Sequence, residues 1–212
     1  MSRISFPRPE AVIFDIGNVL IEWQPELRYD AMVGKARREA MFAAVDLYEM
    51  NERLDRGENF RELVYFTADQ FPEFGDEIRM WYDNWSDIPG PAIDHSVRLL
   101  RALRAANVPV FALSNYGRDS FAISEGDFPF LTEFDKRYIS GQMGVTKPGA
   151  RIYEMVEEDC GIAPERLLFV DDRPDNIAAA EARGWQTHLF KDAQGWADRL
   201  VEAGLLSVET AR

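Results

Sequence analysis

Strand-like apolar runs recur along the chain, and segments with a helical pattern separate them. The runs cover residues 11–14, 108–113, 167–170 and 187–190. The first, Ala-Val-Ile-Phe, is apolar throughout, which is typical of a parallel strand that is buried on both faces. We therefore expect these runs to form the strands of one buried sheet.

Apolar residues at helical spacing mark several of the intervals between the runs. Residues 96–106 place apolar side chains on one face of a helix, and residues 152–159 repeat this pattern. A third helix can begin at Pro174 and stop at Gly184. Alternating strands and helices predict an α/β fold with a parallel, doubly wound sheet.

One long region departs from this alternation. Between about residues 24 and 90 there is no convincing strand, but there are several helical stretches with many aromatic residues. The region is far too long for an ordinary crossover between strands. We therefore predict an all-helical cap domain, residues 23–91, inserted into a core domain of residues 1–22 and 92–212. The Pro-Gly-Pro run at residues 89–91 is interpreted as the hinge that returns the chain to the core.

Composition and charge narrow the function classes. The 212-residue chain has a formal net charge of −13, which argues against a nucleic-acid binder because phosphate backbones need a cationic surface. The N-terminus lacks an apolar stretch long enough for a signal peptide, and we expect no membrane span. The single cysteine, Cys160, excludes an internal disulfide framework and a multi-cysteine zinc site. A cytoplasmic protein fits these features best, as a monomer or a small homo-oligomer.

The first strand ends in a carboxylate, Asp15, with Gly17 close behind. In an open α/β sheet, ligands bind just beyond the carboxyl ends of the strands, and Asp15 falls there. The glycine lets a ligand approach the backbone closely. Taken alone, Asp15 could also be an ordinary residue that caps the next turn.

Polar residues follow two further elements of the predicted sheet. Ser114 and Asn115 end the run at 108–113, where a hydroxyl, an amide and backbone N–H groups can bind an oxyanion. Ser-Asn is also a common turn. Lys147 precedes Pro148 in a segment expected to lie between a strand and a helix. A lone lysine is usually a solvated surface charge, but this position favours a role in the site.

Two adjacent carboxylates, Asp171 and Asp172, follow the run at 167–170. Such neighbours repel one another unless a cation or hydrogen-bond donors compensate. Together with Asp15 they offer oxygen ligands to a hard divalent ion, most simply Mg²⁺. The alternative is that Asp172 or Asp175 caps the helix that begins near Pro174. Capping explains one of these acids but hardly both members of the Asp-Asp pair.

The order of these elements resembles the haloacid dehalogenase (HAD) superfamily over essentially the whole chain, with the helical segment in the place of its cap. The resemblance implies a Mg²⁺-dependent phosphatase that acts on a small phosphorylated metabolite. It implies that Asp15 is the nucleophile and forms an aspartyl-phosphate. Ser114 and the backbone of Asn115 would hold phosphate oxygens, and Lys147 would neutralise the nucleophile and the phosphoryl group. The implied metal ligands are Asp15, the Gly17 carbonyl, Asp172 and Asp171, the last as a further ligand or as a support for one.

Gly17 departs from the family pattern. Phosphatases of this superfamily usually carry a second Asp, the general acid and base, two residues after the nucleophile. Without it, the proton for the leaving group must come from water, a cap residue or elsewhere, and substrates with good leaving groups, such as sugar 1-phosphates, should suffer least. The chain also resembles a subgroup that includes a bacterial α-D-glucose-1-phosphate phosphatase.

Two alternatives remain open. A 2-haloacid dehalogenase uses the same fold and nucleophile without a metal, but that branch replaces the paired acids by small polar residues and has an aromatic residue at the position of Gly17. A non-catalytic HAD-like binding module would explain the missing second Asp. It would not explain why Asp15, Lys147 and both acids are kept.

Overall fold

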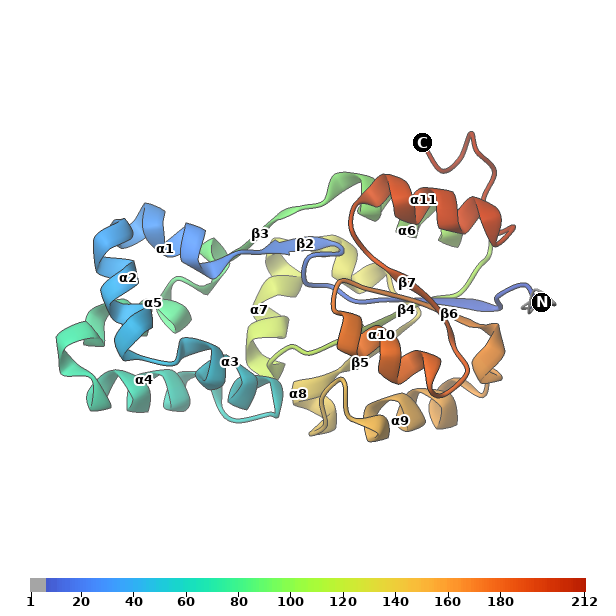
Figure 1. Ribbon diagram of the computed structural model, residues 1–212. Coiled ribbons are helices and arrows are strands. Elements are labelled where there is room, and N and C mark those ends of the chain that lie inside the picture. The colour runs from blue at the N-terminus through green and yellow to red at the C-terminus, as the bar shows by residue number, and fades with distance from the viewer. Residues whose placement is uncertain (1–6) are drawn as a thin grey trace.

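A five-stranded parallel sheet forms the centre of the computed structural model, which describes residues 7–212 (Figure 1). Its strand order is β5-β4-β1-β6-β7. The strands are β1 (Ala11–Phe14), β4 (Val110–Ser114), β5 (Lys136–Ile139), β6 (Leu167–Asp171) and β7 (Gln186–Leu189). The expectation for the N-terminal segment rests partly on residues 1–6, which lie outside the described residues. In residues 7–212, no helix combines the length and the apolar character that a membrane span requires.

Successive residues of β1 contribute to hydrophobic cores on opposite faces of the sheet. Val12 and Phe14 belong to one core, and Ala11 and Ile13 to the other. Helices α6 (Asp94–Ala105), α7 (Arg118–Asp127) and α11 (Ala193–Glu202) pack against the first face, and α9 (Ala150–Cys160) and α10 (Pro174–Glu181) against the second. The central strand is thus buried on both sides, which explains its uninterrupted apolar sequence.

Five helices are inserted between the first and second strands of the main sheet and lie to one side of it (Figure 1). They are α1 (Pro25–Val33), α2 (Lys35–Ala44), α3 (Leu47–Asp55), α4 (Phe60–Gln70) and α5 (Gly75–Asp83). Their apolar faces form a third hydrophobic core, which includes Leu54, Trp81 and Trp85. The insert therefore has an interior of its own.

The chain enters and leaves the insert through one antiparallel ribbon. Strand β2 (Ile21–Trp23) leads into α1, and β3 (Pro89–Ala92) leads back from α5. The Pro-Gly-Pro run forms β3 and lies where the chain returns to the core, and its role as a hinge stays a prediction. Proline is tolerated here because a two-stranded ribbon consists of edge strands.

The sequence predicts most of the main sheet. The bounds of β1 are confirmed, and those of β4, β6 and β7 differ from the predicted runs by one or two residues. Helices α6, α9 and α10 occupy the predicted intervals, and Gly184 has a left-handed backbone with φ 88°. Strand β5 is missing from the prediction, because Lys136 and Arg137 at this edge of the sheet interrupt its apolar character.

Candidate active site

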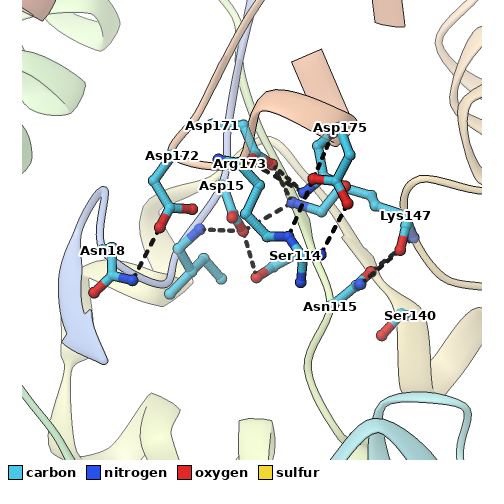
Figure 2. Close-up of polar contacts among 12 residues, drawn as sticks. Asp15, Asn18, Ser114, Asn115, Ser140, Lys147, Asp171, Asp172, Arg173 and Asp175 are labelled. Carbon is cyan, nitrogen blue, oxygen red and sulfur yellow. Dashed lines mark hydrogen bonds and ion pairs between the residues drawn. The ribbon is translucent and has the colours of Figure 1, made fainter. Parts of the chain in front are cut away.

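The carboxyl ends of the three central strands bring Asp15, Ser114 and Asp171 together (Figure 2). Asp15 follows β1, whereas Ser114 and Asp171 are the last residues of β4 and β6. Because β1 lies between β4 and β6, the side chains meet at one edge of the sheet. One carboxylate oxygen from each of Asp15, Asp171 and Asp172 lies within 4.8 Å of the other two. The structure thus places these residues together as expected.

Lys147 is the buried cation of the site. Its Nζ lies 2.6 Å from Asp171 Oδ2 and 3.0 Å from Asp15 Oδ1. The side chain of Asn115 fixes this segment, since its amide donates to the Lys147 carbonyl (2.9 Å) and its oxygen accepts from the Lys147 backbone N–H (2.8 Å). Lys147 precedes α9 as expected, but it follows the short helix α8 (Ser140–Met143) rather than a strand.

The two carboxylate oxygens of Asp15 have different surroundings. Oδ1 accepts hydrogen bonds from Ser114 Oγ and the Ile16 backbone N–H, both at 2.7 Å, and faces Lys147. Oδ2 accepts no hydrogen bond from any described residue. One oxygen is thus held in place, and the other is left for a bound ligand.

Side-chain amides also fix Asp171 and Asp172, the two acids beside Asp15. Asn176 Nδ2 donates to both oxygens of Asp171 at 3.0 Å. Asn18 Nδ2 donates to Asp172 Oδ2 at 2.9 Å (Figure 2). Asp171 is fully buried. These contacts hold the two acids beside Asp15, and Asp172 Oδ1 accepts no hydrogen bond from any described residue.

The capping alternative for the paired acids does not hold. Arg173 precedes α10 and its side chain makes no capping hydrogen bond, whereas Asp175, which is not one of the paired acids, accepts from the Asn176 backbone N–H at 3.0 Å. Asp175 is paired with the Arg173 guanidinium at 2.8 Å. Asp171 accepts from the Arg173 backbone N–H, before the helix begins.

Asn18 and Asn176 belong to the site but were not predicted from the sequence. Asn18 has a left-handed backbone with φ 55°, and its Oδ1 also accepts from the Trp23 N–H at 2.9 Å. A positive φ is several times more common for Asn than for most residues. Asn176 is almost completely buried in the first turn of α10. The available signal in the sequence was an amide side chain that follows the paired acids by a few residues and can hydrogen-bond to them.

The electrostatics of the site indicate a shortage of positive charge. Burial raises the pKa of Asp15 to about 7, although Lys147 and the Ser114 hydrogen bond oppose this effect. Burial also raises the pKa of Asp172. The pKa of Lys147 is raised because attraction to Asp15 and Asp171 outweighs its desolvation. Buried carboxylates with one ammonium group among them form a donor set that suits a hard divalent cation.

A cavity of about 370 Å³ opens over these residues, and the insert forms part of its wall. The sheet edge and its loops contribute Asp15, Ser114, Asn115, Lys147 and Asp172. The insert and its ribbon contribute Trp23, Tyr48, Asn51, Asp55, Arg56 and Trp85. The volume and mixed lining suit a small polar ligand.

Asp55 is the most unusual of the residues from the insert. It lies at the end of α3, it is only 8% exposed, and burial raises its pKa to about 7. The sequence analysis did not assign it a role. A signal was present, since Leu47, Met50, Leu54 and Asp55 follow the i, i+3, i+7, i+8 spacing of a buried helix face. An acid on such a face is a candidate for function.

Comparisons with known proteins agree on one family. The profile of the haloacid dehalogenase-like hydrolases matches residues 9–184. A D-ribitol-5-phosphate phosphatase from Bacteroides thetaiotaomicron is 26% identical over 209 residues, covering 90% of this chain and 96% of that protein. A sesquiterpene phosphatase from Aspergillus oryzae is 28% identical and covers 82% of this chain and 86% of that protein.

Solved structures share the fold as well. A HAD family enzyme from Bacteroides thetaiotaomicron, solved in complex with magnesium and inorganic phosphate, superimposes with a TM-score of 0.67. It is 21% identical, and the match covers 87% of this chain and 95% of the other. At this level of identity the likeness concerns the fold alone.

Proposed function

The chain belongs to the haloacid dehalogenase-like hydrolases, and from this premise we propose that it is a Mg²⁺-dependent phosphatase of small phosphomonoesters. The observation that carries the proposal is the arrangement of Asp15, Lys147 and the two paired acids at the carboxyl edge of the sheet. It combines a nucleophile, a buried cation and a set of oxygen ligands in one cavity.

Asp15 is the proposed nucleophile. Its Oδ1 is held by Ser114 and the Ile16 N–H, so that Oδ2 can attack phosphorus and form an aspartyl-phosphate. Lys147 lies beside the attacking carboxylate and stabilises the negative charge of the transferring group. We assign phosphate binding to Ser114, the backbone of Asn115 and Lys147.

The metal would be held by carboxylate oxygens of Asp15, Asp171 and Asp172 and by the Gly17 carbonyl. The first three fit this role because one oxygen from each lies within 4.8 Å of the other two, and these acids outnumber the cations beside them. Bound Mg²⁺ would neutralise charge on the nucleophile and on the phosphoryl oxygens. Asn18 and Asn176 keep the two neighbouring acids in place.

We propose a phosphorylated sugar or sugar alcohol as the substrate. The cavity of about 370 Å³ can take a molecule of that size, and its lining includes the aromatic residues Trp23 and Trp85 beside polar groups such as Asn51. The similarity to a D-ribitol-5-phosphate phosphatase supports this substrate class. Residues 23–91 would form the cap that selects the substrate, and residues 1–22 and 92–212 the catalytic core.

The dehalogenase and non-catalytic alternatives lack a comparable observation in their favour. A dehalogenase without a metal has no use for the half-buried Asp172 beside Asp171. A binding module has no use for a nucleophile with one oxygen left free. Both alternatives therefore explain the site less well than the phosphatase proposal does.

The decisive experiment measures hydrolysis of p-nitrophenyl phosphate and of a panel of sugar and polyol phosphates. We expect activity with Mg²⁺, none with EDTA, and none for Asp15→Asn. Release of chloride from 2-haloacids in the presence of EDTA would establish the dehalogenase instead. Failure of the wild-type protein to hydrolyse any phosphomonoester with Mg²⁺ would refute the proposal.

A further inference from the structure

The position of Gly17 leaves the proposed reaction without an obvious proton donor. Gly17 carries no side chain, and the acids beside it face the proposed metal. Departure of an alkoxide from phosphorus needs a proton, and a positioned acid accelerates such steps by about 10²–10⁴-fold. Another acid in the cavity must therefore be considered.

Asp55 lines the same cavity from the opposite side, on the helical insert. Its side chain is buried, and among the described residues it forms no ion pair with a lysine or an arginine. Glu52, one turn earlier on α3, also lines the cavity, but its side chain is 58% exposed and paired with Arg56 at 2.8 Å. An exposed carboxylate held by a guanidinium is a poor proton donor. Asp55 is the better candidate.

A hydrogen bond distinguishes the two oxygens of Asp55. Asn51 Nδ2 donates to Asp55 Oδ2 at 3.2 Å, and no described residue bonds to Oδ1. An oxygen that accepts an amide hydrogen bond favours the proton on its partner. In the neutral acid, Oδ1 therefore carries the proton.

Contacts between the insert and the core hold the end of α3 over the site. The Arg118 guanidinium, at the start of α7, donates to the Gly57 carbonyl at 3.0 Å. The Phe60 backbone N–H donates to Asp119 Oδ2 at 3.3 Å. These bonds lie two and five residues after Asp55, so its position relative to Asp15 is fixed through the core.

We propose that Asp55 is the general acid and base of this reaction and supplies from the cap the proton that Gly17 cannot. The inference rests on the proposed phosphatase function. It assigns a catalytic role to a residue of the insert, which otherwise would only enclose the substrate.

With this assignment, every proton is accounted for in both half-reactions, the phosphorylation and the dephosphorylation of Asp15. As Asp15 Oδ2 bonds to phosphorus, the bond from phosphorus to the ester oxygen breaks, and its electron pair goes to that oxygen. Asp55 Oδ1 gives this oxygen its proton, which releases the alcohol and leaves a carboxylate. Asp55 then takes a proton from the water that attacks phosphorus, and the bond to Asp15 breaks. Inorganic phosphate, the Asp15 carboxylate and neutral Asp55 result.

The electrostatic surroundings of Asp55 agree with this role. Burial, helped by the nearby charges of Glu52 and Asp15, raises the pKa of Asp55 to about 7, although Lys147 and Arg56 oppose this effect. Tyr116, from the loop after β4, lies near enough that the charge of Asp55 adds to the effect of burial, which raises the pKa of Tyr116. A raised pKa keeps part of the acid protonated near neutral pH, as a general acid requires.

The test compares Asp55→Asn, which conserves shape, with Glu49→Gln, which removes an exposed charge from the same helix. For each variant, kcat/KM is measured with p-nitrophenyl phosphate, whose leaving group needs no proton, and with primary-alkyl phosphates, whose leaving group does. Binding of beryllofluoride with Mg²⁺, followed by thermal shift, reports whether the site around Asp15 is intact. Asp55→Glu tests rescue by another carboxylic acid.

We expect the kcat/KM of Asp55→Asn to fall by about 10²–10⁴-fold for alkyl phosphates and by less than about threefold for p-nitrophenyl phosphate. Beryllofluoride binding should persist, Asp55→Glu should recover part of the alkyl-phosphate activity, and Glu49→Gln should resemble the wild type. Equal losses on both substrates, or unchanged alkyl-phosphate activity, would overturn the role of Asp55. So would a wild-type enzyme that hydrolyses only p-nitrophenyl phosphate. Complete inactivity of the wild type would instead refute the phosphatase proposal.

Discussion

Gly57 of the insert touches Gly141 of the core so closely that a Cβ atom on Gly57 would lie 2.9 Å from the Gly141 carbonyl oxygen. Gly57 also has φ +102°, a conformation that side chains with a Cβ rarely adopt. Gly57 lies two residues after Asp55. Contact between these two glycines therefore sets how near the end of α3 comes to the catalytic edge of the sheet.

Gly57→Ala should push the end of α3 away from the core and misplace Asp55. We expect kcat/KM for alkyl phosphates to fall by up to about 10²-fold, since a displacement of about 1 Å can have that cost. Gly126→Ala is the matched control, because a Cβ there meets no atom within 4 Å and lies inside α7. It should leave activity unchanged and raise the free energy of unfolding by about 0.5–1 kcal/mol. Wild-type activity in Gly57→Ala would contradict the positioning argument.

Mg²⁺ should stabilise the folded protein. Ion binding to the acids at the sheet edge favours the native state, by about 2.7 kcal/mol at a concentration 100 times the Kd. Thermal denaturation with and without Mg²⁺ measures this effect as a rise in Tm. Asp172→Asn should remove most of the rise, whereas Asp198→Asn, which neutralises an exposed acid on α11, should keep it. An undiminished response in Asp172→Asn would argue against this metal site.

Lys147→Met should destabilise the protein as well as inactivate it. Removal of the ammonium leaves Asp15 and Asp171 buried without their cation, and the loss of one partner from a buried pair costs about 3–5 kcal/mol. Lys136→Met provides the comparison at the surface, where the lysine is paired with Asp159 at 2.7 Å. That variant should lose less than about 1 kcal/mol. Denaturant unfolding without added metal measures the free energy of unfolding of both variants. Equal losses of this free energy would contradict the assignment of Lys147 as the buried counter-charge.

Glu157→Gln should reduce stability in a pH-dependent manner. Glu157 accepts from the Trp185 indole at 2.8 Å and from Arg183, whose hydrogen bond lowers the pKa of the carboxyl. A lowered pKa in the folded state contributes stability above the unfolded pKa, and this is lost as the pH falls through the folded pKa. We expect a deficit of about 1 kcal/mol at pH 7 that shrinks below about pH 4. A deficit that is constant from pH 3 to pH 7 would contradict this explanation.

Alkyl-phosphate hydrolysis should weaken as the pH rises through about 7. The neutral form of Asp55 gives up the proton in the first step, and its pKa is raised to about 7, so deprotonation removes the active form. The pH profile of kcat/KM for an alkyl phosphate should therefore have a descending basic limb, which p-nitrophenyl phosphate should lack. The limb should disappear in Asp55→Asn, and its persistence there would assign it to another group.

The sequence predicts the parts of this molecule that depend on local pattern. The apolar run of β1 and the acids at the ends of β1 and β6 can be recognised because a parallel strand buried on both faces leaves little room for other residues. Strand β5 carries charges at the sheet edge, and β3 contains two prolines. Neither has the composition of a buried strand, so both depend on pairing partners that a local pattern does not reveal.

The contribution of the insert to the site could not be predicted in the same way. Asp15 and Asp55 are separated by forty positions, and only the packing of α3 against the core brings both to one cavity. The same holds for Asn18 and Asp172, which hydrogen-bond across 154 positions. Motif order located the residues at the sheet edge, because the topology of parallel strands is regular. No such regularity governs how a helical insert sits on a sheet.

The separate hydrophobic interior of α1–α5, attached by the single β2–β3 ribbon, bears on how new specificities could evolve or be engineered. Substitutions inside that interior can reshape the wall of the cavity that the insert forms, without touching the proposed nucleophile or the proposed metal ligands. Helix α3 is the exception. Exchange of the whole insert for a foreign one would remove Asp55, so under the proposed role of this residue a chimera would need an acid restored at that point, or at position 17, to hydrolyse unactivated esters.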